Sequence, residues 1–326
     1  MEETGSLNPK ELTRLKNRLN KKFGVPGMAK FVSAGGGLPA LRLTHPSGST
    51  ALIHLQGANV VSFIPAGSDR DLLWLDPDAE YRVDRAIRGG IPIVFPWFGP
   101  DPTGRGLPQH GFARDRPWTV SIVEKPNNLP DGHPDANGPW ISALFTLQHS
   151  VATKALWDYP CELELHVFLN KDDIEVRLCV ENPTTSGKSF KFEDALHTYY
   201  AVNDARTTSV VGLDGWDYFD KNRDYGRFTQ QGPVTFHGPV DRVFPAAVGT
   251  CVIEEAGPGG AVFRRVRAGK SGSGTTVVWN PGARADRPEA GPPPFVCVEA
   301  ANVGDHAVTL APGETHVMTV TIAPVD

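Results

Sequence analysis

The fold is decided by the stretch "LRLTHPSGSTALIHLQGANVVSFIPAGSDRD", residues 41–71. It contains three short runs of alternating or β-branched apolar residues, "LRLTH", "TALIHLQ" and "ANVVSFI", separated by clusters of Pro, Gly, Ser and Asp. Alternating runs favour half-buried strands, and those four residue types favour tight turns. The stretch therefore predicts three consecutive antiparallel β-strands.

The same texture continues along most of the chain. Further strands are predicted from runs such as "ISALFTLQHS", "CELELHVFLN", "DIEVRLCVEN" and "HVMTVTIA". Helical intervals between them are almost absent, which excludes a doubly wound α/β fold and favours an all-β sandwich of antiparallel sheets. Two long Pro/Gly-rich segments, 125–139 and 281–294, are predicted to be loops.

One helix is expected at the N-terminal end. Apolar residues recur there at helical spacing, after a cap signal at Asn8-Pro9 and before Gly24: Leu12, Leu15, Leu19 and Phe23. We expect residues 1–29 to form a short amphipathic helical extension. Because no composition shift or repeat period marks another boundary, residues 30–326 are expected to form a single β domain.

The charge and composition exclude several classes of function. A formal net charge of -5 and a pI near 6.1 leave no electrostatic footprint for nucleic acid or for an anionic membrane. The four cysteines are widely spaced, and the ten histidines form no HxH or HExxH pattern, so neither a metal site nor a cofactor is predicted. The first residues lack the apolar core of a signal peptide, and we expect a cytoplasmic monomer.

Two strands carry polar residues where burial is expected. In "KSFKFEDALHTYYAV", residues 188–202, alternation places His197 on the same face as Tyr199. In "FVCVEAANV", residues 295–303, Glu299 interrupts an otherwise apolar strand. An ionised carboxylate buried without partners is unfavourable by several kcal/mol, so Glu299 must be exposed, paired or used in chemistry. The spacing alone is equally compatible with two structural roles: a His197 packed in the protein interior and a Glu299 in a structural ion pair.

Three further segments combine turn formers with charged or amide side chains: "RGGIPIVFPWFGP" (88–100), "LPQHGFARDRPW" (107–118) and "TFHGPVDRVF" (235–244). They supply five more candidate site residues: Arg88, Gln109, His110, Arg114 and Asp241. Taken singly, each is as easily explained as a charged residue on a solvated rim. A function for them depends on their occurring together.

Six blocks of the chain, in order, resemble the aldose 1-epimerase superfamily and, within it, the glucose-6-phosphate 1-epimerase (hexose-6-phosphate mutarotase) branch. The blocks are "RGGIPIVFPWFGP", "LPQHGFARDRPW", "ALHTYYAV", "GLDGWDYFDK", "VVWNPG" and "FVCVEAANV". The resemblance runs from about residue 88 to residue 303 and implies a galactose-mutarotase-like β-supersandwich of antiparallel sheets.

The resemblance also implies an activity and the residues that perform it. The activity is the interconversion of the α and β anomers of a hexose 6-phosphate, with glucose 6-phosphate the first choice, by opening and reclosing the sugar ring without a cofactor. His197 matches the general acid of the family and Glu299 its general base. Substrate-binding positions are implied at Arg88, Gln109, His110, Arg114 and Asp241.

The chemistry of the implied reaction adds three expectations. A sugar phosphate carries close to two negative charges, which Arg88 and Arg114 would offset. Gly89 and Gly90 would let the backbone approach this ligand closely. General acid–base catalysis is most efficient when the pKa values lie near the working pH, so Glu299 needs a raised pKa while an ordinary histidine already meets the requirement.

Three other functions remain open from the sequence. The first is a mutarotase that acts on unphosphorylated hexose with the same acid and base. The second is a protein that binds sugar without catalysis, and the third is a metal-dependent sugar isomerase.

Overall fold

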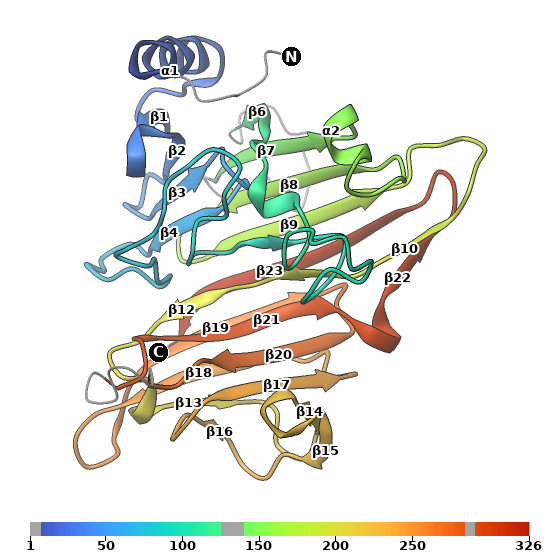
Figure 1. Cartoon of the computed structure of the whole chain (residues 1–326). Coiled ribbons are helices and arrows are strands. Elements are labelled where there is room, and N and C mark those ends of the chain that lie inside the picture. Colours follow the sequence, from blue (N-terminus) through green and yellow to red (C-terminus); the bar gives the residue numbers. More distant parts are fainter. Residues whose placement is uncertain (1–7, 125–139, 284–290, 326) are drawn as a thin grey trace, which may run out of the picture.

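The computed structural model describes residues 8–124, 140–283 and 291–325. Antiparallel strands dominate these residues, and the helices are few and short (Figure 1). The predicted loop 125–139, and residues 284–290 of the predicted loop 281–294, lie outside the described residues. The expectation of an all-β fold of antiparallel sheets is confirmed.

Residues 41–71 form most of a four-stranded sheet with the order β1-β2-β3-β4. Its strands are β1 (Ala29–Ser33), β2 (Pro39–Thr44), β3 (Thr50–His54) and β4 (Val60–Ile64). All three pairings are antiparallel. The three strands predicted within residues 41–71 are therefore confirmed.

Two larger sheets make up the body of the molecule. The nine-stranded sheet has the order β16 (Val234–Thr235), β13 (Thr208–Val211), β18 (Cys251–Ala256), β19 (Val262–Ser271), β23 (Thr315–Val325), β9 (Ile174–Glu181), β8 (Glu162–Leu169), β7 (Ile141–Gln148) and β6 (Thr119–Glu124). The eight-stranded sheet has the order β15 (Gly226–Thr229), β14 (Asp217–Asp220), β17 (Val240–Pro245), β20 (Thr275–Asn280), β21 (Phe295–Asn302), β11 (Asp194–Leu196) and β5 (Ile93–Val94), with β12 (Tyr199–Ala201) also paired to β21. A small two-stranded sheet joins β10 (Phe190–Phe192) to β22 (Val308–Leu310).

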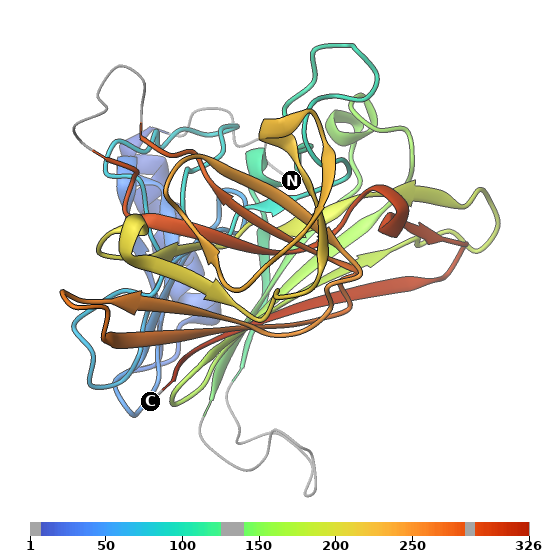
Figure 2. The same cartoon turned by 90° about the horizontal axis from the view of Figure 1, so that it is seen from below.

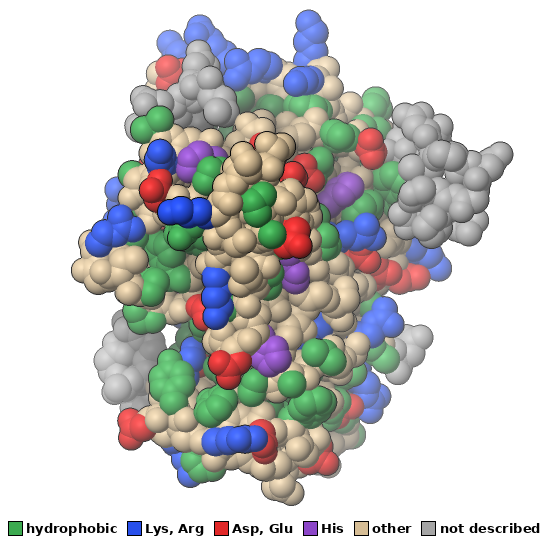
Figure 3. All heavy atoms as spheres, turned by 90° about the vertical axis from the view of Figure 1, so that its right-hand side faces the viewer, with side chains coloured by type: hydrophobic (Ala, Val, Ile, Leu, Met, Phe, Trp, Pro, Cys, Tyr) green, Lys and Arg blue, Asp and Glu red, His purple; other side chains and the backbone are tan. Residues whose placement is uncertain are grey.

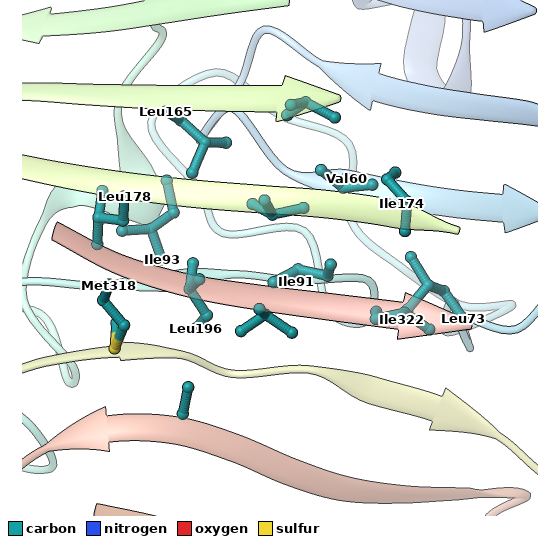
Figure 4. Packing of buried hydrophobic residues seen from close by; sticks show 14 of the residues in the cluster. Val60, Leu73, Ile91, Ile93, Leu165, Ile174, Leu178, Leu196, Met318 and Ile322 are labelled. Carbon is teal, nitrogen blue, oxygen red and sulfur yellow. The ribbon is translucent and has the colours of Figure 1, made fainter. Parts of the chain in front are cut away.

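One apolar core lies between these layers, which Figure 2 shows stacked when the molecule is seen from below. Figure 4 shows side chains from different sheets meeting there, among them Ile93 of β5, Leu178 of β9 and Leu196 of β11. Each fully buried aliphatic side chain of this kind stabilises the fold by about 1.5–3 kcal/mol. The core thus holds the eight-stranded sheet, which carries the candidate site, rigidly against its neighbours.

The predicted N-terminal helix is α1 (Pro9–Phe23). Asn8 caps it: its side chain accepts from the backbone of Lys10 and of Glu11, and the Glu11 carboxylate accepts from the backbone of Asn8. The helix is tied to β1 because the amide of Asn20 bonds both the N–H and the C=O of Phe31. Among the described residues, no helix has the length and apolar character that crossing a bilayer requires.

The outer face of α1 is basic. It exposes five cationic side chains: Lys10, Arg14, Arg18, Lys21 and Lys22. Basic side chains gather at the top of Figure 3, where this helix lies, while both signs of charge are interspersed over the rest of that face.

The remaining helical elements are single turns. They are α2 (Val151–Lys154) and the 3₁₀ turns η1 (Gly35–Gly37), η2 (Ala113–Asp115), η5 (Ala205–Thr207), η6 (Lys221–Arg223) and η8 (Gly304–His306). Two of them, η2 and η6, position residues of the candidate site.

Segment 188–202 differs from the single strand that its alternation predicts. It breaks into β10, β11 and β12, and β10 pairs in a different sheet from the other two. His197 falls at the break between β11 and β12. Alternation alone does not reveal this break, because the apolar pattern continues through it.

Candidate active site

Glu299 lies in β21, and its strand alternates in space as the sequence predicts. Val296 and Val298 point into the main core, whereas Cys297 belongs to a small apolar cluster on the opposite face. Glu299 shares that second face, where a further small cluster surrounds Ala301. Its side chain is 1% exposed, so the carboxyl group is shielded from solvent.

His197 is brought to Glu299 by strand pairing. Leu196 of β11 is opposite Ala300 of β21, and Tyr199 of β12 is opposite Cys297, so the break that holds His197 falls beside Glu299. The imidazole stacks on the Tyr199 ring with centroids 4.8 Å apart and 9° between the planes. This stacking fixes the orientation of the imidazole.

The two side chains are close but not hydrogen-bonded. Nδ1 of His197 lies 3.5 Å from Oε1 of Glu299. Neither His197 Nδ1 nor Glu299 Oε2 has a hydrogen-bond partner within the protein. A buried polar atom without a partner is unfavourable by about 1–3 kcal/mol, which a ligand bound at the pair can relieve.

Burial shifts the pKa values of Glu299 and His197 in opposite directions. It raises the pKa of Glu299 to about 8, because the carboxylate loses its solvation. Burial, followed by the neighbouring His110 and Arg114, lowers the pKa of His197 well below 6.5. The expected rise for Glu299 is confirmed, and the expectation of an unshifted histidine is wrong. In the free protein these shifts favour the state in which the proton shared by the pair is on Glu299 and His197 is neutral.

Asp241 lies on the same face of the sheet. In neighbouring strands Asp241 is opposite Trp279, and Trp279 is opposite Cys297, so the three form a row next to Glu299. Burial raises the pKa of the Asp241 carboxyl. Its Oδ1 lies 3.5 Å from Nζ of Lys221, a residue that sequence reasoning did not select.

A second group of predicted residues lies next to His197: Gln109, His110 and Arg114. Arg114 of η2 donates from Nη2 to the backbone O of Gln109 over 2.7 Å, and its buried Nε has no partner. The His110 ring meets His197 edge-on, with centroids 5.8 Å apart. Nδ1 of His110 accepts from the backbone N–H of Gly99, and burial lowers the pKa of His110 to about 3. His110 is therefore a neutral ring whose proton is on Nε2.

Arg88 lies at the margin of the site. Its side chain is 51% exposed, and Nη1 bonds Oδ2 of Asp76 over 2.9 Å. Its guanidinium lies 5.7 Å from the centre of the Trp74 ring. Arg88 is therefore already paired in the free protein, unlike the unpartnered Nε of Arg114.

The glycines after Arg88 serve the packing of the chain. Both have positive φ, and a Cβ added at Gly89 would lie 2.5 Å from the carbonyl oxygen of Trp74. One added at Gly90 would lie 2.4 Å from the carbonyl oxygen of Val60. Both glycines thus allow a close approach of the protein's own backbone, whereas an approach to a ligand was expected from the sequence.

Aromatic rings enclose the pair, and the sequence analysis did not assign them to the site. Trp279 meets the His197 ring at 90° with centroids 5.8 Å apart. Phe98 packs edge-on against His110 and lies under the ammonium group of Lys221. Strand alternation placed Tyr199 on the face of His197, but the rings of Trp279 and Phe98 arrive from other segments.

Within the described part of the chain, no three His, Cys, Asp or Glu side chains gather as a metal-binding group. A cavity of about 380 Å³ lies away from the site, between the end of α1 and β1–β2, and none of the predicted site residues lines it. Exposure rises from Glu299 through Lys221, at 21%, to Arg88, at 51%. The site therefore runs from a buried acid–base pair to a cationic margin.

Residues 39–323 match the family described as aldose 1-epimerase. The chain belongs to the aldose 1-epimerase family. The resemblance seen in the six sequence blocks is confirmed, and the match extends from β2 into β23, beyond those blocks on both sides.

Two of the similar proteins match most of this chain. A protein of Escherichia coli K12 that is provisionally named glucose-6-phosphate 1-epimerase is 35% identical over 271 residues, covering 81% of this chain and 83% of its own length. A crystal structure of a Salmonella typhimurium protein, provisionally named a mutarotase, superposes with a TM-score of 0.77 at 27% identity and covers 95% of this chain and 99% of that one.

A galactose mutarotase related enzyme of Lactobacillus acidophilus shares the fold alone. It superposes with a TM-score of 0.65 at 14% identity, covering 88% of this chain and 97% of its own. The expectation of a galactose-mutarotase-like sandwich of antiparallel sheets is thereby confirmed.

Proposed function

We propose that this member of the aldose 1-epimerase family interconverts the α and β anomers of a hexose 6-phosphate, with Glu299 as general base and His197 as general acid. The observation that carries the proposal is the enclosed His197–Glu299 pair, 3.5 Å apart and not hydrogen-bonded to each other. The name of the relative from Escherichia coli supports glucose 6-phosphate as the substrate.

The reaction balances with these two residues alone. Glu299 removes the proton from the hydroxyl at C1, the C1–O5 bond breaks as the C1=O bond forms, and His197 delivers a proton to O5. After rotation about C1–C2, His197 takes the O5 proton back, O5 attacks the other face of C1, and Glu299 protonates O1. No covalent intermediate with the protein is needed.

The proton distribution favoured in the free protein is the one that the ring-opened intermediate of this reaction requires. Ring opening leaves Glu299 protonated and His197 neutral, which is the state that burial favours in the free protein. Ring opening therefore starts from the less populated distribution, with Glu299 ionised and His197 protonated, and any group that stabilises the charged form of Glu299 raises the share of that reactive state.

Polar and charged side chains around the His197–Glu299 pair are suited to bind the sugar hydroxyls and the phosphate. Asp241 would accept hydrogen bonds from sugar hydroxyls, and Gln109 and His110 would donate to sugar oxygens. Arg114, with its unpartnered Nε, and Arg88 at the margin would offset the charge of the phosphate. We further propose a cytoplasmic monomer with a helical extension over residues 1–29 and one domain over residues 30–326, which gel filtration and limited proteolysis of the full chain would test.

The activity is tested by exchange NMR between the anomers of glucose 6-phosphate, with glucose as the comparison. We expect faster exchange of the phosphorylated sugar, and kcat/KM that falls as the pH rises through about 8, because the pair then loses its single proton. Equal rates for both sugars would favour a mutarotase for unphosphorylated hexose. Calorimetric binding without exchange would favour a non-catalytic sugar-binding protein, and activity lost to a chelator would favour a metal-dependent isomerase.

A further inference from the structure

The turn that carries Lys221 has an unusual backbone. Lys221 opens η6, between β14 and β15, and the buried Asp220 caps that turn by accepting from the N–H of Asn222 over 3.0 Å. Two consecutive residues with side chains follow in the left-handed region, Asp224 with φ 52° and Tyr225 with φ 56°. Such conformations are unfavourable, and they concentrate at functional sites where the surroundings hold them.

The side chain of Lys221 is held by two segments far from it in sequence. Nζ lies 3.5 Å from Oδ1 of Asp241 in β17. It also lies over the ring of Phe98, 4.6 Å from the centre. Only 21% of the side chain is exposed, so this ammonium group is fixed within the site and is not a mobile surface charge.

The charges around the acid–base pair place Lys221 on the side of Glu299. Among the charged groups that act on Glu299, Lys221 is the strongest, ahead of Asp241 and Arg114. For His197 the order is reversed, because Arg114 acts on it more strongly than Lys221 does. Both cations therefore act on the pair, Lys221 ahead of Arg114 for the carboxyl group and Arg114 ahead of Lys221 for the imidazole.

We propose that Lys221 is a positioning residue of the epimerisation, whose ammonium group, fixed between Asp241 and the face of Phe98, stabilises the charged form of Glu299 that acts as the base. This inference rests on the proposed function. It adds a residue that acts through Glu299, where the sequence blocks implied only groups that touch the substrate.

The expected sign follows from the charge. Lys221 lowers the pKa of Glu299, whereas Asp241 raises it. Removing the positive charge therefore makes Glu299 hold its proton to higher pH and reduces the fraction of the pair in which the proton is on His197. Each unit by which the pKa of Glu299 rises relative to that of His197 lowers this fraction about tenfold.

The test compares Lys221→Met with Lys221→Arg in anomer exchange across pH. For Lys221→Met we expect a lower plateau of kcat/KM and an alkaline limb that lies at higher pH than in the unsubstituted protein. Lys221→Arg keeps the charge and is expected to keep the position of that limb. Lys171→Met removes an equally charged but exposed side chain and serves as the matched control.

Asp241 offers a perturbation of opposite sign. Asp241→Asn should lower exchange through lost sugar contacts, yet move the alkaline limb to lower pH, because it removes a charge that raises the pKa of Glu299. The double variant Lys221→Met/Asp241→Asn should have its limb between those of the two single variants. A merely structural role of Lys221 would not produce these opposite shifts.

A second measurement separates this proposal from the proposed function. In protein labelled with ¹³C at the glutamate carboxyl carbon, the signal absent from Glu299→Gln is that of Glu299, and its titration is followed without substrate. We expect this titration at higher pH in Lys221→Met than in the unsubstituted chain. An unchanged titration in a folded Lys221→Met protein, or equal shifts in Lys221→Met and Lys221→Arg, would overturn the proposal; absent exchange in the unsubstituted chain would instead overturn the proposed function.

Discussion

Glu299 and Asp194 are two buried carboxyl groups in paired strands of one sheet, on opposite faces. Burial raises the pKa of both, to about 8 for Glu299 and to about 7 for Asp194. Asp194 accepts a hydrogen bond from the amide of Asn302 over 2.8 Å, and the same amide donates to the carbonyl of Gly272. Asp194 is therefore tied into a network of neutral partners.

Glu299 is surrounded differently. The charged groups that act on it are Lys221, Asp241 and Arg114, and it lies beside an imidazole that it does not hydrogen-bond. Burial and a raised pKa are common to both carboxyl groups, so neither feature separates a structural role from a catalytic one. Each also has one carboxyl oxygen without a partner. What separates them is the set of neighbours: a hydrogen-bonded neutral amide for Asp194, and charged groups with an imidazole for Glu299.

The largest expected effect is on activity at Glu299. Glu299→Gln keeps the size of the side chain but removes the base, and we expect exchange of glucose 6-phosphate anomers to fall by about 10²- to 10⁴-fold. Asp194→Asn is the matched change at the other carboxyl group and should leave exchange nearly unaltered. Near wild-type exchange in Glu299→Gln would show that Glu299, like Asp194, is not the catalytic base.

The same variant should make the protein more stable at high pH. Below about pH 4.5 the carboxyl group is neutral in both the folded and unfolded states; between there and about pH 8 only the unfolded state ionises, so stability declines. Glu299→Gln escapes this decline and should gain roughly 2–4 kcal/mol in the free energy of unfolding above pH 8, with the gain vanishing near pH 4. Urea unfolding at several pH values measures it, and a constant difference would contradict the raised pKa.

At Asp194 the larger effect is expected on stability. Asp194→Ala removes the acceptor of the Asn302 amide and should destabilise the fold by about 1–3 kcal/mol. Exchange per folded molecule should stay close to that of the unsubstituted protein. Asp194→Asn retains an acceptor oxygen and should recover most of the stability in chemical denaturation. A loss of exchange without a loss of stability in Asp194→Ala would reverse the assignment of roles.

Arg88 should give the smallest effect, because it is half exposed and paired with Asp76 in the free protein. For Arg88→Ala we expect kcat/KM for glucose 6-phosphate to fall roughly tenfold, about 1.4 kcal/mol, with little change for glucose, since only the phosphorylated sugar offers a charge to bind. Steady-state kinetics on both sugars measures the difference. Equal losses would indicate that Arg88 supports the backbone around it and does not bind phosphate.

Much of the fold could be predicted, because its signals are local. The turn formers within residues 41–71 delimit β2, β3 and β4, and Asn8-Pro9 marks the start of α1. The break around His197 could not be predicted, since β10 pairs with β22 more than a hundred residues away along the chain. Pairing across such a separation leaves no mark on the alternation of segment 188–202.

The candidate site likewise combines features that could be predicted from the sequence with features that could not. Lys221 stands at the end of the block "GLDGWDYFDK", but nothing in that block tells that its ammonium group meets Asp241 and Phe98. The rise in the pKa of Glu299 was expected from its apolar strand, whereas the fall in that of His197 depends on burial and on cations from other segments. A cation's reach depends on distance in space, which local sequence does not encode.

By itself the sequence determined most of the strands, the capped helix, the face on which Glu299 lies and, through six ordered blocks, the family. Those features arise from side-chain alternation, capping and turn chemistry within a few residues. Only the tertiary structure decided that His197 and Glu299 lie 3.5 Å apart, that Arg88 is paired with Asp76 and that Lys221 belongs to the site. The physical reason is that strand pairing and charge interactions act between residues that are neighbours in space and remote along the chain.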